Sequence, residues 1–166
     1  EDRIQYKFTD ITILEKSLTH KSYSNEFGGE NYERLEFLGD AIIEFVVSDS
    51  LINYKELDAG ELSKLRAKLV STNYLYDIAI SLGLNQYVQK SKSLPSLSKK
   101  NTADLFESLI GAIYLDGGLD NAKRVIQQYI LINDKNISNV IKNVKDYKTL
   151  LQEKLQKEGT PFNYEL

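Results

Sequence analysis

Hydrophobic residues recur every three or four positions along most of the chain, which is the spacing of amphipathic α-helices. The longest run extends from about Tyr32 to Tyr54, and the others cover shorter segments: 11–18, 62–69, 75–82, 105–114 and 122–130. No convincing strand-like alternation of polar and apolar residues occurs before the last few positions. The pattern therefore predicts an all-α domain.

Turn and capping residues set the expected ends of the first helices. Asp10 precedes the first run and is a candidate N-cap. Leu57–Gly60 are expected to form a turn before the run at 62–69. Gly83 follows the run at 75–82 and is expected to stop that helix.

The second half of the chain begins with a different composition. Pro95 lies in a Ser/Lys-rich segment, so residues 90–100 are expected to form a loop. The next helix is expected to follow Thr102 and to end before Gly117–Gly118. Residues 133–146, rich in Asn, Lys and Ile, suggest a short helix that leads into a hinge.

Composition narrows the range of functions. The 166 residues are 42% hydrophobic, which is enough for one ordinary domain with its own core. The absence of Cys excludes disulfides, thiolate zinc sites, iron–sulfur clusters and a Cys nucleophile, and the single histidine, His20, excludes poly-His metal sites. There is no apolar run of membrane-spanning length and no signal-peptide pattern. We expect a cytoplasmic protein without a membrane partner, and the missing Met suggests that position 1 is not the biological start.

The net charge of -3 argues against a generic nucleic-acid binder, but the charge is unevenly distributed. Residues 1–60 carry 13 acidic and 6 basic side chains. Residues 84–103 carry four lysines and no acid. Acid concentrated in one region beside a basic loop differs from a uniformly acidic surface.

Acidic residues inside otherwise apolar helices are the strongest functional signal. Glu33, Glu36 and Asp40 lie at i, i+3 and i+7, so they share one helix face. Gly39 beside them costs a helix about 1 kcal/mol relative to Ala. Asp104 and Glu107 repeat the i, i+3 spacing in a second helix.

Two helices that each present a carboxylate pair favour a site for a hard cation, because oxygen ligands suit Mg²⁺ or Mn²⁺. Metal-activated water is then the most economical nucleophile, and phosphodiester hydrolysis fits such a site. The same spacing also occurs on ordinary solvated helix faces. A di-iron bundle needs Glu-x-x-His pairs, and His20 is far from both helices in sequence.

Four segments resemble sequence motifs of the ribonuclease III family, and they occur in the same order as in that family. The family's signature stretch is matched without a gap by ERLEFLGDA at residues 33–41, and its second acidic block resembles ADLFESLIGAIYLDGG at 103–118. LTHKS at 18–22 is similar to the N-terminal motif, and LSKLRAKLV at 62–70 to the middle helix. The resemblance covers about residues 3–145.

The resemblance implies an all-helical nuclease domain, here residues 1–145, that forms a homodimer and cuts double-stranded RNA with Mg²⁺, for which Mn²⁺ can substitute. It implies 5′-phosphate and 3′-hydroxyl products with a two-nucleotide 3′ overhang, and no organic cofactor. By position, the metal-binding catalytic carboxylates are Glu36, Asp40, Asp104 and Glu107. Glu33 becomes an accessory acid, and Phe37 a dimer-interface residue.

Two features depart from the family pattern. Relatives commonly carry Glu where Ala59 precedes Gly60. At the C-terminus, residues 146–166 resemble the first helix and strand of a double-stranded-RNA-binding domain and then stop. The residues expected to face RNA are Gln152, Glu153 and Gln156 in this fragment, and Lys64, Lys68, Lys99 and Lys100 in the nuclease domain.

Two alternative functions stay open at this stage, a carboxylate-bridged redox bundle and a catalytically silent scaffold. A catalytically silent RNA-binding or ribosome-associated scaffold could share the fold, although such relatives typically lose the acids. His20 is unique in the chain, and it is expected to hydrogen-bond near a helix end and to help place neighbouring residues rather than to act as a general base.

Overall fold

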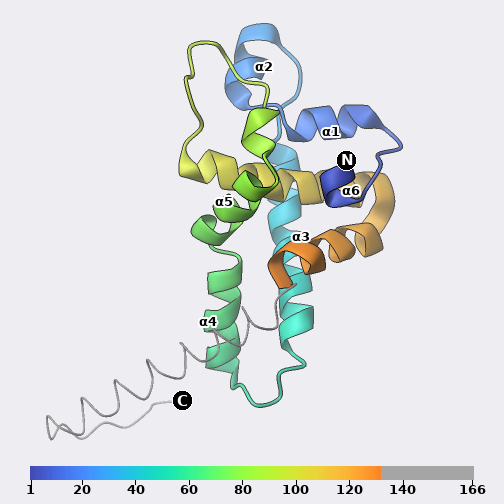
Figure 1. The fold of residues 1–166 in the computed structure, drawn as a ribbon, viewed down its shortest axis with the longest axis vertical. Coiled ribbons are helices and arrows are strands. Elements are labelled where there is room, and N and C mark those ends of the chain that lie inside the picture. The colour runs from blue at the N-terminus through green and yellow to red at the C-terminus, as the bar shows by residue number, and fades with distance from the viewer. Residues whose placement is uncertain (132–166) are drawn as a thin grey trace, which may run out of the picture.

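The computed structural model describes residues 1–131 as an assembly of helices (Figure 1). The bounds are η1 (Asp2–Ile4), α1 (Ile11–Ser17), α2 (Lys21–Phe27), α3 (Glu33–Leu51), α4 (Ala59–Leu69), α5 (Thr72–Ser81), η2 (Leu84–Gln86), α6 (Lys99–Ile126) and η3 (Gln127–Leu131). No strand is present within this range; its one parallel bridge joins Thr19 to Gln89. The all-α prediction is confirmed. The predicted helix and hinge at 133–146 and the RNA-binding fragment at 146–166 lie outside the described residues.

Side-chain caps explain where the helices begin. Asp10 caps α1 by accepting a hydrogen bond from the Thr12 N–H, as predicted. The expected turn at Leu57–Gly60 is wrong in its second half, because Asp58 and Glu61 form a capping box that starts α4 at Ala59. The start expected after Thr102 is also wrong, because the Ser98 hydroxyl caps α6 and starts it at Lys99.

The α6 helix does not end before Gly117–Gly118. It passes through a kink at Gly118, whose φ of 80° lies in the left-handed region that favours glycine. Beyond the kink, Ala122, Val125 and Ile126 are fully buried, so packing restarts the helix in a new direction. The glycine pair therefore bends the chain instead of stopping it.

The α3 and α6 helices cross at very short range, and two glycines make this possible. A Cβ atom on Gly39 would lie 1.8 Å from the Glu107 carbonyl oxygen, and one on Gly111 would lie 2.2 Å from the Leu35 carbonyl oxygen. Any larger side chain at either position would collide with the backbone of the other helix. Gly39 destabilises its own helix, but it is needed because only glycine allows α6 to approach α3 this closely.

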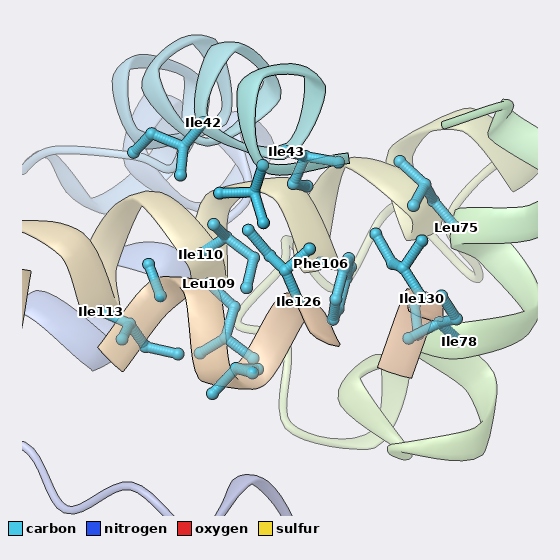
Figure 2. Close-up of a cluster of buried hydrophobic side chains, with 14 of the residues drawn as sticks. Ile42, Ile43, Leu75, Ile78, Phe106, Leu109, Ile110, Ile113, Ile126 and Ile130 are labelled. Atoms are coloured by element: carbon cyan, nitrogen blue, oxygen red, sulfur yellow. The ribbon is translucent and has the colours of Figure 1, made fainter. Parts of the chain in front are cut away.

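The hydrophobic core surrounds this crossing (Figure 2). Ile42 and Ile43 of α3 face Phe106 and Ile110 of α6. Ile130 of η3 and Leu75 of α5 complete the cluster. Below the crossing in Figure 1, α4 lies beside the second half of α3. In residues 1–131, no helix has the length and apolar character needed to cross a membrane.

Candidate active site

A cavity of about 440 Å³ lies where α3 and α6 converge beside α5. Its lining is mainly acidic and consists of Glu33, Glu36, Phe37 and Asp40 from α3, Thr72 from α5, and Lys100, Asp104 and Glu107 from α6. All five acids that the sequence singled out therefore line the same cavity. The close crossing of the two helices brings the acidic faces together.

Three of these acids form a tight group. Glu36, Asp104 and Glu107 each offer a carboxylate oxygen, and these oxygens lie within 4.8 Å of one another. Asp40 lines the cavity but is not part of this group. Glu33 is also at the wall, where the Lys21 ammonium lies 3.3 Å from its carboxylate.

Lys100 is the one basic residue of the cavity lining. Its ammonium lies 3.0 and 3.1 Å from the two Asp104 carboxylate oxygens and 3.4 Å from Glu36 Oε1. The sequence predicts an RNA contact for Lys100 and does not link this residue to the acids. The i, i+4 spacing of Lys100 and Asp104 was the available signal.

Burial sets the electrostatics of the group. Desolvation raises the pKa of Glu107 to about 8, and the nearby charge of Asp104 acts in the same direction. Desolvation also raises the pKa of Glu36 and of Asp104, although the Lys100 ammonium opposes both shifts. The cluster is therefore costly to ionise without an added cation.

The donor set fits a hard divalent cation. It contains carboxylate oxygens and no nitrogen or sulfur ligand, which is the preference of Mg²⁺ and Mn²⁺. A divalent charge would favour the ionised form of all three acids and so offset the desolvation that raises their pKa values. The expectation of one metal site formed by both helices is consistent with this geometry.

The raised pKa values predict how the metal-free protein responds to pH. Between the ordinary value of 4.5 and about 8, the folded state holds a proton on Glu107 that the unfolded chain releases. The free energy of unfolding should therefore fall as pH rises through 7 toward about 8. Thermal melts in EDTA should show this fall, and Glu107→Gln should flatten it. A melting temperature that rises over the same interval would contradict the shift.

Of the other described residues predicted to act at a site, Phe37 lies at the cavity wall, and Lys64, Lys68 and Lys99 do not line the cavity. Lys64 and Lys68 are exposed on α4, and Lys99 places its ammonium 5.0 Å from the centre of the Tyr76 ring. Phe37 is 81% exposed at the cavity wall. Gln152, Glu153 and Gln156 lie outside the described residues.

Ala59 is not part of the cavity lining. It starts α4, where the Asp58 carboxylate accepts from the Glu61 N–H at 2.8 Å and Glu61 accepts from the Asp58 N–H at 2.9 Å. The two neighbouring acids thus cap the helix, and neither lines the cavity.

Comparison with known proteins agrees with this arrangement. Residues 10–134 match the family described as ribonuclease-III-like. The chain is 41% identical over 171 residues to ribonuclease 3 of Clostridium tetani, covering 96% of this chain and 70% of that protein. It is 38% identical over 176 residues to ribonuclease 3 of Clostridium beijerinckii, covering 100% and 74%.

Solved structures give the same result. The nuclease domain of ribonuclease III from Campylobacter jejuni, in a structure concerned with flexibility of the region involved in dimer formation, superposes with a TM-score of 0.70 at 38% identity. That match covers 78% of this chain and 94% of the other. Dicer from Pichia stipitis superposes with a TM-score of 0.58 at 26% identity, covering 75% and 55%.

The helical fold and its acidic cavity thus define a nuclease domain of the metal-dependent class. The chain belongs to the ribonuclease III family, the endoribonucleases specific for double-stranded RNA. The resemblance seen in the sequence is confirmed over residues 10–134, and the enzyme is favoured over a catalytically silent scaffold.

Proposed function

We propose that the acidic cavity is the site at which this chain hydrolyses double-stranded RNA with Mg²⁺. The observation that carries the proposal is the grouping of Glu36, Asp104 and Glu107 within 4.8 Å at the crossing of two helices. Asp40 is the fourth acid of the site, at the wall of the same cavity, and Glu33 is an accessory acid. Mn²⁺ has the same preference for oxygen ligands and is expected to substitute.

The chain's own residues have separate tasks in this proposal. The bound ion supplies a Lewis acid and lowers the pKa of water. Glu36, Asp104 and Glu107 hold it from two helices, so the spacing of its ligands depends on the backbone crossing. Lys100 balances part of the negative charge of Glu36 and Asp104 until the ion binds.

The experiment is a cleavage assay on a long RNA duplex and on a matched single strand, with and without Mg²⁺. The proposal expects cutting of the duplex only, with 5′-phosphate and 3′-hydroxyl ends and a two-nucleotide 3′ overhang, which sequencing of the product ends would read. Duplex binding without cleavage in either Mg²⁺ or Mn²⁺ would instead support the silent scaffold.

We propose further that the active form is a homodimer built on α3. Large apolar side chains are exposed along this helix and at its C-cap: Phe37 is 81%, Phe45 57% and the C-cap residue Ile52 67% exposed. At 3.6 residues per turn, Phe45 and Ile52 lie about 80° and 60° around the helix axis from Phe37, so the three form one broad stripe. Such a stripe is typical of an interaction surface.

Phe37→Asp is expected to dissociate this dimer, because it puts a charge into an apolar contact. Sedimentation should then give a mass near the 19.0 kDa of one chain, whereas the unmodified protein should give twice that mass. Phe27→Asp is the matched control, since Phe27 is 59% exposed on α2 and off the stripe. A monomeric unmodified protein at micromolar concentration would contradict the proposal.

The remaining assignments concern RNA contacts, domains and location. We propose that Lys64, Lys68 and Lys99 contact RNA phosphates, which would position the duplex without reading its sequence. We also propose that residues 1–145 are the nuclease domain and that 146–166 begin an RNA-binding domain, with Gln152, Glu153 and Gln156 toward the minor groove. The cytoplasm is the proposed location.

A further inference from the structure

His20 lies at a junction of four chain segments. It is 5% exposed and caps α2, because its Nδ1 accepts from the Ser22 N–H at 3.1 Å. The Ser22 hydroxyl lies 2.8 Å from the same nitrogen and accepts from the Ser91 N–H at 3.1 Å. The His20 N–H donates to the Gln89 carbonyl at 2.9 Å. The ring is thus held by Ser22 of α2, and the loop before α6 holds the His20 backbone and the Ser22 hydroxyl.

The other ring nitrogen faces α6. Since Nδ1 is an acceptor, the proton of the neutral ring is on Nε2, which lies 3.0 Å from Asn101 Nδ2. Two donors cannot bond, so the Asn101 amide must turn to let its Oδ1 accept from Nε2–H. Burial lowers the pKa of His20, and Lys21 acts in the same direction, so the ring stays neutral at neutral pH. Asn101 follows Lys100 and precedes Asp104 by one helical turn.

The same junction holds the beginning of α3. The His20 ring packs edge-on against Tyr32 with ring centres 5.7 Å apart. The Tyr32 N–H donates to the Thr19 carbonyl, and the Tyr32 carbonyl accepts from the Glu36 N–H at 2.8 Å. Tyr32 is 3% exposed and is the residue directly before α3. One side of His20 therefore contacts the start of α3, and its Nε2 contacts the start of α6.

We infer that His20 is a positioning residue: through Tyr32 and Asn101 it holds the first turns of α3 and α6 at a fixed separation. This separation sets the spacing of Glu36 from Asp104. The glycine crossing at Gly39 and Gly111 fixes the helices further along, so His20 is the second point of attachment that defines their angle. The inference rests on the proposed function of the acids, and His20 itself does not line the cavity.

The test uses His20→Asn and Asn101→Ala in the full chain. The Asn carbonyl can replace Nδ1 as the α2 cap but is too short to reach Asn101, so the first variant removes the link to α6 and keeps the cap. Each variant is expected to lower kcat about tenfold with little change in KM, because the ligands rather than RNA binding are disturbed. Electron paramagnetic resonance of Mn²⁺ without RNA should show weaker ion binding.

The double variant separates positioning from general stability. His20→Asn with Asn101→Ala should be no worse than either single change, because both remove the same link. Asp10→Ala is the matched control: it removes the cap of α1, so it should lower the melting temperature and leave kcat and Mn²⁺ affinity unchanged.

Two outcomes would overturn the inference: unchanged kcat and Mn²⁺ affinity in both single variants, or additive losses in the double variant. Asp104→Asn distinguishes this failure from failure of the proposed function. If Asp104→Asn binds Mn²⁺ and cuts RNA normally, the metal site itself is misplaced. If Asp104→Asn loses Mn²⁺ binding and RNA cleavage while the His20 and Asn101 variants keep both, the metal site is supported and only the positioning role of His20 is wrong.

Discussion

Glu107→Gln is expected to abolish cleavage of double-stranded RNA while leaving the fold intact. Glu107 belongs to the group of three carboxylates, and Gln keeps its size but removes the charge that would hold a divalent ion. Loss of one electrostatic group at a reacting centre typically costs about 10²–10³-fold in kcat, and a direct ligand should cost at least that much. Single-turnover cleavage of an RNA duplex in Mg²⁺ measures the effect.

The controls for this result address fold and charge separately. Glu15→Gln makes the same change on the exposed surface of α1 and should cut normally. The Glu107→Gln protein should melt at the same or a higher temperature than the unmodified protein in EDTA near pH 8, since a repulsive charge is gone. Normal cleavage by this variant would remove Glu107 from the active site.

Gly39→Ala is expected to be the most damaging small substitution in the described part of the chain. The new Cβ would lie 1.8 Å from the Glu107 carbonyl oxygen, and this obstacle is backbone, which cannot rotate away. The two helices would have to separate, at a cost of about 1–3 kcal/mol or more for an overpacked core. Separation also moves Glu36 away from Glu107, so cleavage should fall along with stability.

Gly60→Ala is the matched control for this prediction. Its Cβ would meet only the Asp58 side chain at 3.3 Å, and Ala is the better residue within a helix. Chemical denaturation should show unchanged or higher stability for Gly60→Ala and a clear loss for Gly39→Ala. Equal stability of the two glycine variants would mean that the crossing is not close.

The sequence predicted the site better than it predicted the ends of the helices. Helical spacing alone placed Glu36 with Asp40 and Asp104 with Glu107, because i, i+3 and i+4 neighbours share a face in any α-helix. The unfavourable glycine at position 39 of a helix indicated the segment that contains both the acidic residues and the close helix crossing. The preference of hard cations for clustered carboxylates suggested that the two helices share one site, and the family resemblance supported this pairing.

Features that depend on tertiary packing were missed. A glycine pair is an ordinary stop signal, but buried residues after Gly118 continue α6 beyond it. Lys100 is expected to contact RNA because it belongs to the lysine-rich loop segment. Its i, i+4 spacing from Asp104 is visible in the sequence, whereas its reach to Glu36 across the crossing is not. The separation of Asp40 from the other three acids likewise depends on how the helices cross.

The protonation state of the cavity has a consequence for how metal binding is measured. Near neutral pH, Glu107 carries a proton, and the Lys100 ammonium forms ion pairs with Glu36 and Asp104. Before all three acids can act as ligands, Glu107 must release its proton and Lys100 must withdraw. Ion uptake therefore acidifies a weakly buffered solution, and calorimetric heats will include the ionisation heat of whichever buffer accepts the proton. Titrations in two buffers of different ionisation enthalpy would count the protons displaced.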